Sequence, residues 1–242
     1  MGNLLIEIGN TALKAAWAEG VTLGRIYRYQ GEKRIDFIVS LAEKERPATM
    51  VVASVVGIAP VDERRLRKYC ADLVILDSAH TSIAERYGLP SYLGYDRAAA
   101  IIAVKYLFKG KACTLMDFGT TFTVDFIAAD GSYLGGNTSL GCRTRFKALN
   151  RYSRTLPLVD TPVDTPALGT STTSSIEAGV ISGIMFEIHG YTALYPENIT
   201  VFTGGDAIYF ANKMKNSIFV VCNLVLMGLA LMTEDYVAQK SI

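Results

Sequence analysis

Short apolar runs typical of strands alternate along the chain with segments in which apolar residues recur at helical spacing. Residues 49–56 (TMVVASVV) and 73–76 (LVIL) are continuous apolar runs of the kind found in buried parallel strands. Residues 35–45 have the apolar spacing of a helix, and residues 61–69 have the charge density of an exposed helix. Strands that alternate with helices in this way predict an α/β fold.

The second half of the chain continues the alternation. Apolar spacing predicts helices at residues 94–108, 140–153, 176–195 and 220–236. Residues 199–202 (ITVF) form a short β-branched and aromatic run that predicts a further strand. The α/β prediction therefore extends over the whole chain.

The most regular stretch is residues 114–136, which read as strand, glycine turn, strand, turn and strand. An apolar run ends in Asp117, and Gly119–Thr121 then form a turn with small and hydroxyl side chains. Alternating residues follow, and Asp130-Gly131 is a dipeptide typical of tight hairpin turns. Backbone N–H groups and hydroxyls in such a turn can approach an anion closely, with an acid alongside to hold a cation. We interpret this stretch as a phosphate-binding hairpin.

The N-terminus repeats the same order of residues. An apolar run leads into Glu7, Gly9–Thr11 form the turn, and Glu19-Gly20 and Leu23-Gly24 follow at matching separations. A single one-residue gap after the turn aligns the two stretches. Two unrelated hairpins would be the simpler interpretation, but the shared order favours an internal duplication. We therefore predict domains at residues 1–110 and 111–242, each presenting one phosphate loop to a shared cleft.

Composition excludes several other classes of protein. The 242 residues suit two modest domains, half of them are hydrophobic, and the net charge is +1, which gives no electrostatic reason to expect binding to nucleic acid or membrane. The four cysteines form no CxxC pair, and two histidines without metal-like spacing argue against a zinc site or a Ser-His-Asp triad. We expect a cytoplasmic protein with reduced thiols.

A second candidate site lies at residues 94–97 (GYDR), at the start of the predicted helix 94–108. The helix dipole favours an acid in the first turn, which would explain Asp96 as a simple cap. The same dipole disfavours the cation of Arg97 at that end. Capping therefore does not account for the pair.

Four motifs together resemble those of the type III pantothenate kinases: GYDR at 94–97, DFGTTFTVD at 117–125, GG at 135–136 and FTGGDA at 202–207. The resemblance covers nearly the whole chain. It implies two duplicated ribonuclease-H-like domains of the actin-like ATPase and sugar-kinase superfamily, with mixed sheets and a cleft between them. It also implies a cytoplasmic homodimer that phosphorylates pantothenate to 4'-phosphopantothenate, the first step of coenzyme A biosynthesis.

The resemblance also assigns roles to individual residues. Asp96 would be the catalytic base, Asp117 would hold a monovalent cation (K⁺ or NH₄⁺), and ATP would bind with a divalent cation, most simply Mg²⁺. The residues that would contact pantothenate are Tyr87, Gly94, Tyr95, Asp96, Arg97 and Thr172. Those that would contact ATP are Glu7, Ile8, Gly9, Asn10, Thr11, Ala12, Leu13, Lys14, Thr120, Gly204 and Gly205.

The chain departs from the family pattern at two places. Glu7 stands where the family usually has Asp, and residues 137–141 (NTSLG) replace an Ile and a Pro-Gly after the GG pair. Two alternatives therefore stay open: a kinase for another small hydroxylated acceptor, and a non-catalytic or divergent nucleotide-binding regulator on the same scaffold.

Overall fold

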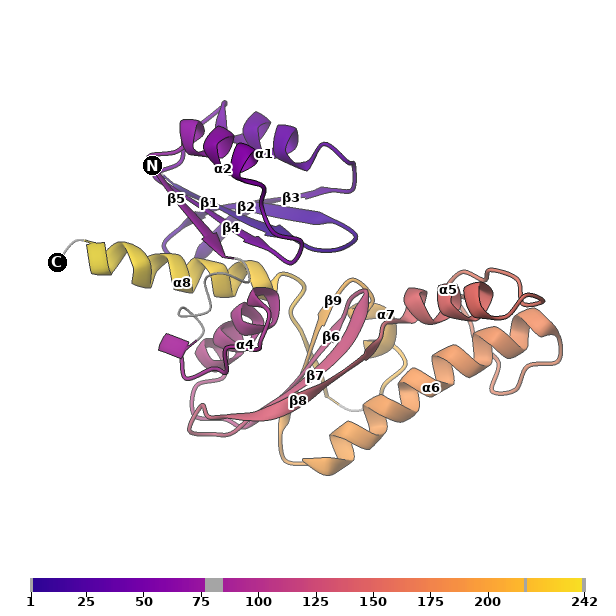
Figure 1. Cartoon of the computed structure of the whole chain (residues 1–242). Helices are drawn as coiled ribbons and strands as arrows, with labels where there is room; N and C mark the ends of the chain where they lie inside the picture. Colours follow the sequence, from indigo (N-terminus) through magenta and orange to yellow (C-terminus); the bar gives the residue numbers. More distant parts are fainter. Residues whose placement is uncertain (1, 77–84, 216, 241–242) are drawn as a thin grey trace. The chain divides into compact units, whose positions relative to one another are not determined.

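The computed structural model describes residues 2–76, 85–215 and 217–240 (Figure 1). The chain forms two compact units. Unit 1 consists of Met1–Leu107 together with Asn223–Ile242, and unit 2 consists of Phe108–Cys222. Each unit is built on a five-stranded sheet.

The sheet of unit 1 has the strand order β3-β2-β1-β4-β5. Its strands are β1 (Asn3–Ile8), β2 (Leu13–Glu19), β3 (Thr22–Tyr29), β4 (Thr49–Ser54) and β5 (Asp72–Leu76). The first three form an antiparallel meander, whereas β4 runs parallel to β1 and β5 parallel to β4. All six residues of β4 are buried, as expected for an inner strand covered on both faces.

Helices cover both faces of this sheet (Figure 1). The helices α1 (Arg34–Ala42) and α2 (Pro60–Leu66), the latter continued by the 3₁₀ turn η1 (Arg67–Tyr69), pack on one face. Their side chains join the inward-facing residues of β1 in one hydrophobic cluster. On the other side lie α8 (Leu224–Lys240), which contacts β1, β3 and β4, and α4 (Tyr95–Leu107).

The helices α4 and α8 pack against each other at very close range. Gly228 of α8 lies so near the backbone of α4 that a Cβ at this position would overlap the Ala99 carbonyl. Residues 223–240, placed by the sequence in a C-terminal domain, therefore pack within unit 1. The reason is tertiary: the apolar surface of α8 is buried against α4 and the first sheet.

Unit 2 repeats the topology of unit 1 with the strand order β8-β7-β6-β9-β10. Its strands are β6 (Cys113–Phe118), β7 (Thr121–Ile127), β8 (Tyr133–Leu140), β9 (Ile199–Gly204) and β10 (Phe219–Val220). Again three strands form an antiparallel meander, and the next two add in parallel on the side of the first. This shared order confirms the predicted α/β fold with two duplicated units.

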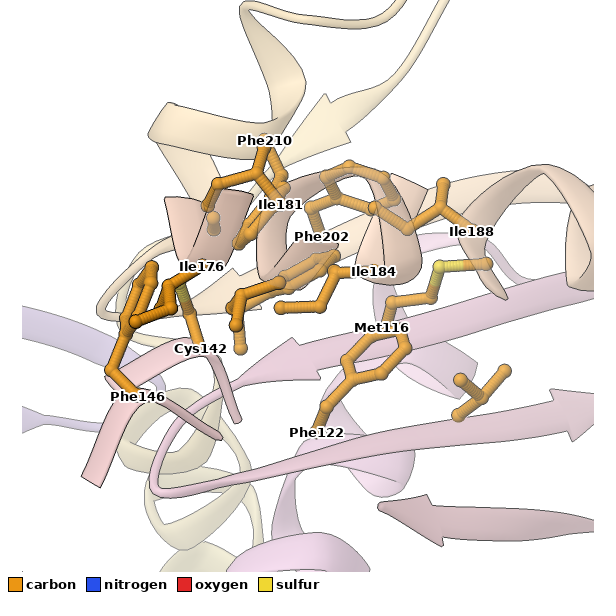
Figure 2. Close-up of a cluster of buried hydrophobic side chains, with 14 of the residues drawn as sticks. Met116, Phe122, Cys142, Phe146, Ile176, Ile181, Ile184, Ile188, Phe202 and Phe210 are labelled. Carbon is orange, nitrogen blue, oxygen red and sulfur yellow. The ribbon is translucent and has the colours of Figure 1, made fainter. Parts of the chain in front are cut away.

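The core of unit 2 lies between its sheet and the helices α5 (Cys142–Tyr152), α6 (Thr172–Leu194) and α7 (Ala207–Ala211). Figure 2 shows that phenylalanines and isoleucines from these elements, with Met116, meet in one cluster. The stacked and edge-on rings around Phe118 tie the end of β6 to this cluster. The strands β6 and β9 are thus packed against the hydrophobic core of unit 2.

Two helix boundaries differ from the sequence prediction. The helix expected from residue 140 begins at Cys142, because β8 continues to Leu140 and pairs there with Thr121. The helix expected from residue 220 begins at Leu224, because Phe219–Val220 form β10 instead. Among the described helices, none is both long and apolar enough to cross a membrane.

Candidate functional site

The predicted site residues divide between the two units. Unit 1 contains Glu7 to Lys14, Tyr87 and Gly94 to Arg97, and unit 2 contains Asp117, Thr120, Thr172, Gly204 and Gly205. In each unit the glycine turn follows the first strand of the sheet, as the alternating pattern predicted.

The first turn connects β1 to β2 and is closed by its own backbone. Gly9 N–H donates to the Ala12 carbonyl at 3.0 Å. Arg34, from the start of α1, donates from Nη1 to the Gly9 carbonyl and from Nη2 to the Asn10 carbonyl, both at 3.1 Å. Nothing in the sequence pattern linked Arg34 to this turn.

Glu7 and Lys14 lie opposite each other across the first hairpin. Lys14 Nζ is 3.6 Å from Glu7 Oε2, an ion pair rather than a hydrogen bond. Oε2 is buried and accepts no hydrogen bond from the described residues. Burial raises the pKa of Glu7 and the charge of Asp96 raises that pKa further, while Lys14 opposes the rise. Glu7 and Asp96 belong to the same unit.

Asp96 is the second residue of α4, where a glycine leaves room for its carboxylate. The Gly94 carbonyl accepts the Ala98 N–H at 2.9 Å, which starts the helix, and Asp96 Oδ1 accepts the Arg97 N–H at 2.8 Å. A Cβ at Gly94 would come within 2.8 Å of the same Oδ1. Tyr95 is buried, whereas Asp96 and Arg97 are half-buried. The GYDR segment therefore holds the Asp96 carboxylate at the helix start without enclosing it.

Tyr87 lies with the C-terminal helix in this structure. Its hydroxyl donates to Asp235 Oδ2 of α8 at 2.5 Å, and its carbonyl accepts from Lys105 Nζ at 3.0 Å. Lys105 is near the C-terminal end of α4, and nine residues of helix span about 13 Å from Asp96. Burial, with a contribution from Asp235, raises the pKa of Tyr87. The hydrogen bond of Tyr87 thus joins α8 to the segment that precedes α4.

In unit 2, Asp117 and Gly204 lie where β6 and β9 end side by side. Asp117 pairs in register with Thr203, and Phe118 with Gly204. Gly204 has φ +93°, and a Cβ there would overlap Asp117 Oδ1 and lie 2.6 Å from the Phe118 backbone. Only glycine adopts this φ readily and has no Cβ to clash, so Gly204 lets β9 come close to the Asp117 carboxylate.

The second turn is held from outside by the start of α5. The Thr120 carbonyl accepts from Thr144 Oγ1 at 2.6 Å and from Gly141 N–H at 3.1 Å. Asp206 N–H donates to the Phe118 carbonyl at 3.1 Å, which fixes the glycine turn after β9 against the same loop. Burial raises the pKa of Asp206, and Arg143 opposes this rise. Thr144 and Asp206 were missed as site residues, although Asp206 follows the two glycines directly.

Thr172 is the first residue of α6, after a capping box formed by Ser171 and Ser174. It lines a groove of about 830 Å³ between α5 and α6, together with Leu149 and Tyr152. Thr172 therefore lies at this groove.

The carboxylates fit the ions expected of a nucleotide site. Mg²⁺ prefers oxygen ligands, and the buried Glu7 Oε2 is a carboxylate oxygen that accepts no hydrogen bond from the described residues. Within the described ranges, no three His, Cys, Asp or Glu side chains come close enough to hold a metal ion by themselves.

Comparisons with known proteins agree on one family. The family model of the type III pantothenate kinase matches residues 3–193. The type III pantothenate kinase of Phocaeicola vulgatus is 38% identical over 232 residues, covering 94% of this chain and 96% of the relative. That of Christiangramia forsetii is 35% identical over 241 residues, covering 96% and 98%.

Solved structures show the same fold at low identity. The activator of the 2-hydroxyisocaproyl-CoA dehydratase from Clostridium difficile, solved with ADPNP, gives a TM-score of 0.59 at 13% identity and covers 100% of this chain and 98% of its own. The ROK hexokinase from Thermus thermophilus gives 0.50 at 13% identity, covering 96% and 98%. These likenesses confirm the expected α/β fold over nearly the whole chain.

Proposed function

The chain belongs to the type III pantothenate kinases and phosphorylates pantothenate with ATP in coenzyme A biosynthesis, and we propose that Asp96 is the base of this reaction. The observation that carries the proposal is the position of Asp96 at the start of α4, where its carboxylate is half-buried, accepts the Arg97 N–H and belongs to the same unit as the first glycine turn. Asp96 accepts the proton of the primary hydroxyl while that oxygen bonds to the γ-phosphorus and ADP leaves. This role requires hydrogen-bond reach more than a shifted pKa.

The two glycine turns hold the phosphates of ATP in this proposal. Residues 7–14 and Thr120 contact the phosphates, and Gly204 and Gly205 border the adenosine. The divalent cation that accompanies ATP neutralises phosphate charge, which is the main requirement of phosphoryl transfer. Glu7 Oε2 supplies an oxygen for that ion, and Asp117 holds the monovalent cation.

The GYDR segment recognises pantothenate. Arg97 offers two parallel N–H donors to the pantothenate carboxylate, a geometry that a carboxylate accepts well. Gly94 and Tyr95 complete the contact, with Thr172 and Tyr87. For Tyr87, pantothenate takes the place of Asp235 as the hydrogen-bond partner of the hydroxyl.

We also propose a cytoplasmic homodimer that depends on K⁺ or NH₄⁺. The helix α6 exposes two large apolar side chains, Phe186 to 74% and Leu194 to 63%, which a second subunit covers in this proposal. Sedimentation of the purified protein at twice the monomer mass is the expected result.

An ADP-release assay tests the proposed reaction. Release is expected only when ATP and pantothenate are both present, and it should be faster in K⁺ than in Na⁺ buffer. Hydrolysis that is independent of pantothenate would favour one of the two alternatives, another acceptor or a regulatory nucleotide site. Equal rates in both buffers would remove the monovalent cation from Asp117.

A further inference from the structure

Arg34 joins the start of α1 to the first glycine turn. Its two terminal nitrogens donate to two successive carbonyls, those of Gly9 and Asn10, each at 3.1 Å. The contact spans 24 and 25 residues of sequence. One planar guanidinium group therefore holds two neighbouring peptide groups of the loop.

Local forces in α1 do not explain this arginine. A cation at the first residue of a helix opposes the helix dipole, and the N-cap Lys33 makes no capping hydrogen bond through its side chain. The acid of the first turn, Asp36, pairs with Arg65 at 2.6 Å. Among the described residues, the hydrogen bonds of the Arg34 guanidinium are those with the loop.

Peptide geometry determines what these contacts do to the loop. In a planar trans peptide the carbonyl and the following N–H point in opposite directions. With the Gly9 and Asn10 carbonyls turned to Arg34, the N–H groups of Asn10 and Thr11 are directed away from it. The loop thus presents these donors on the face opposite the guanidinium.

In unit 2 a carbonyl of the glycine turn also accepts hydrogen bonds from outside the turn, but from different donors. The Thr120 carbonyl accepts from both the Gly141 N–H and Thr144 Oγ1, so the Thr121 N–H is directed away from α5. In both turns, donors outside the turn hydrogen-bond to its carbonyls, although the donors differ. That recurrence argues for a role in presenting N–H donors rather than an accident of packing.

We propose that Arg34 is a positioning residue that orients the first turn so that its N–H groups face the phosphates of ATP. The proposal rests on the function inferred above, because it takes the phosphates as the anion that these donors meet. Arg34 acts through the loop backbone and does not itself react.

The test compares Arg34→Ala with Arg46→Ala in steady-state kinetics. Arg46 is a matched control, since it also donates to a backbone carbonyl of unit 1, that of Cys70 at 3.3 Å, but far along the chain from the turn. Arg34→Ala should raise the KM for ATP by about tenfold or more, because charged hydrogen bonds are lost, and leave the KM for pantothenate within about twofold. Arg46→Ala should leave both KM values unchanged.

Two further measurements separate positioning from general damage. Arg34→Lys keeps the charge but loses the paired guanidinium donors, so it should still raise the KM for ATP. This variant decides the question if Arg34→Ala does not fold. Free guanidinium at non-denaturing concentration should partly restore Arg34→Ala. An unchanged KM for ATP, or equal rises in both KM values, would overturn the role of Arg34. Absence of pantothenate-dependent ADP release in the wild type would instead overturn the proposed function.

Discussion

Lys14 faces Glu7 directly across the first hairpin, and its ammonium lies 3.6 Å from the buried Oε2 of that acid. In the second hairpin the acid at the matching position, Asp117, lies opposite the uncharged Thr123. Glu7 and Lys14 are seven positions apart and Asp117 and Thr123 are six apart, so the loop between the paired residues is one residue longer in the first hairpin. The duplicated turns thus share their backbone design and differ in the charge beside the acid.

Glu7→Gln should change how stability depends on pH. The raised pKa of Glu7 means that the folded state binds more protons than the unfolded state between the ordinary value of 4.5 and the raised one. Wild-type stability should therefore fall relative to Glu7→Gln as pH rises through that window. Thermal unfolding of both proteins without nucleotide, from about pH 4 to 7.5, measures the difference. A constant difference would show that burial does not raise this pKa.

Asp96→Asn should keep the fold and lose turnover. The amide oxygen can still accept the Arg97 N–H that the carboxylate accepts at 2.8 Å, so the start of α4 is preserved. Removal of a general base lowers kcat by about 10²- to 10⁴-fold, while pantothenate binding should change little. Single-turnover kinetics check the first expectation and calorimetry the second. Near-normal turnover would take the role of base away from Asp96.

Arg97→Ala should weaken pantothenate binding selectively. Loss of a charged hydrogen bond costs about 1.5–3 kcal/mol, or about 10- to 150-fold in affinity. Nucleotide affinity should stay as in the wild type, and calorimetric titration with each ligand measures both. Equal pantothenate affinity would mean that Arg97 serves the structure of α4 alone.

Gly204→Ala should damage the second site, and Gly205→Ala should do so much less. The added methyl at Gly204 overlaps Asp117 Oδ1 on a backbone with φ +93°, whereas a Cβ at Gly205 meets its nearest neighbour, the Phe118 carbonyl, only at 4.0 Å. Strain of this kind costs about 1–3 kcal/mol. Urea unfolding measures the loss, which should exceed that of Gly205→Ala. Equal losses would show that β9 can move away from Asp117 at little cost.

Gly228→Ala should loosen unit 1 by separating α4 from α8. Overpacking typically costs about 1–3 kcal/mol, and here the neighbouring group is the Ala99 backbone, which cannot rotate away. Gly190→Ala is the matched control, because it also lies within a helix but its Cβ would meet nothing within 4 Å. That control should gain about 0.5–1 kcal/mol. Denaturant unfolding should show that Gly228→Ala is less stable than the wild type and that Gly190→Ala is more stable.

The sequence was most informative where structure is determined locally. The turn at Gly119, the alternation of β7 and the start of α4 at Gly94 all follow from residue types at short spacing, so these elements were predicted at or near their positions. Contacts between distant segments were not predictable. The pairing of Arg34 with Asn10 and the packing of Gly228 on Ala99 depend on how elements meet in space, which no local pattern encodes.

The return of α8 to unit 1 has a consequence for synthesis on the ribosome. Unit 2 is continuous in sequence and is complete once residue 222 has emerged, whereas unit 1 still lacks the helix that covers one face of its sheet. Domains usually fold in the order in which they are made. Here the half that is translated first is finished last, and until then the exposed side of its sheet and of α4 is a surface for chaperones to protect.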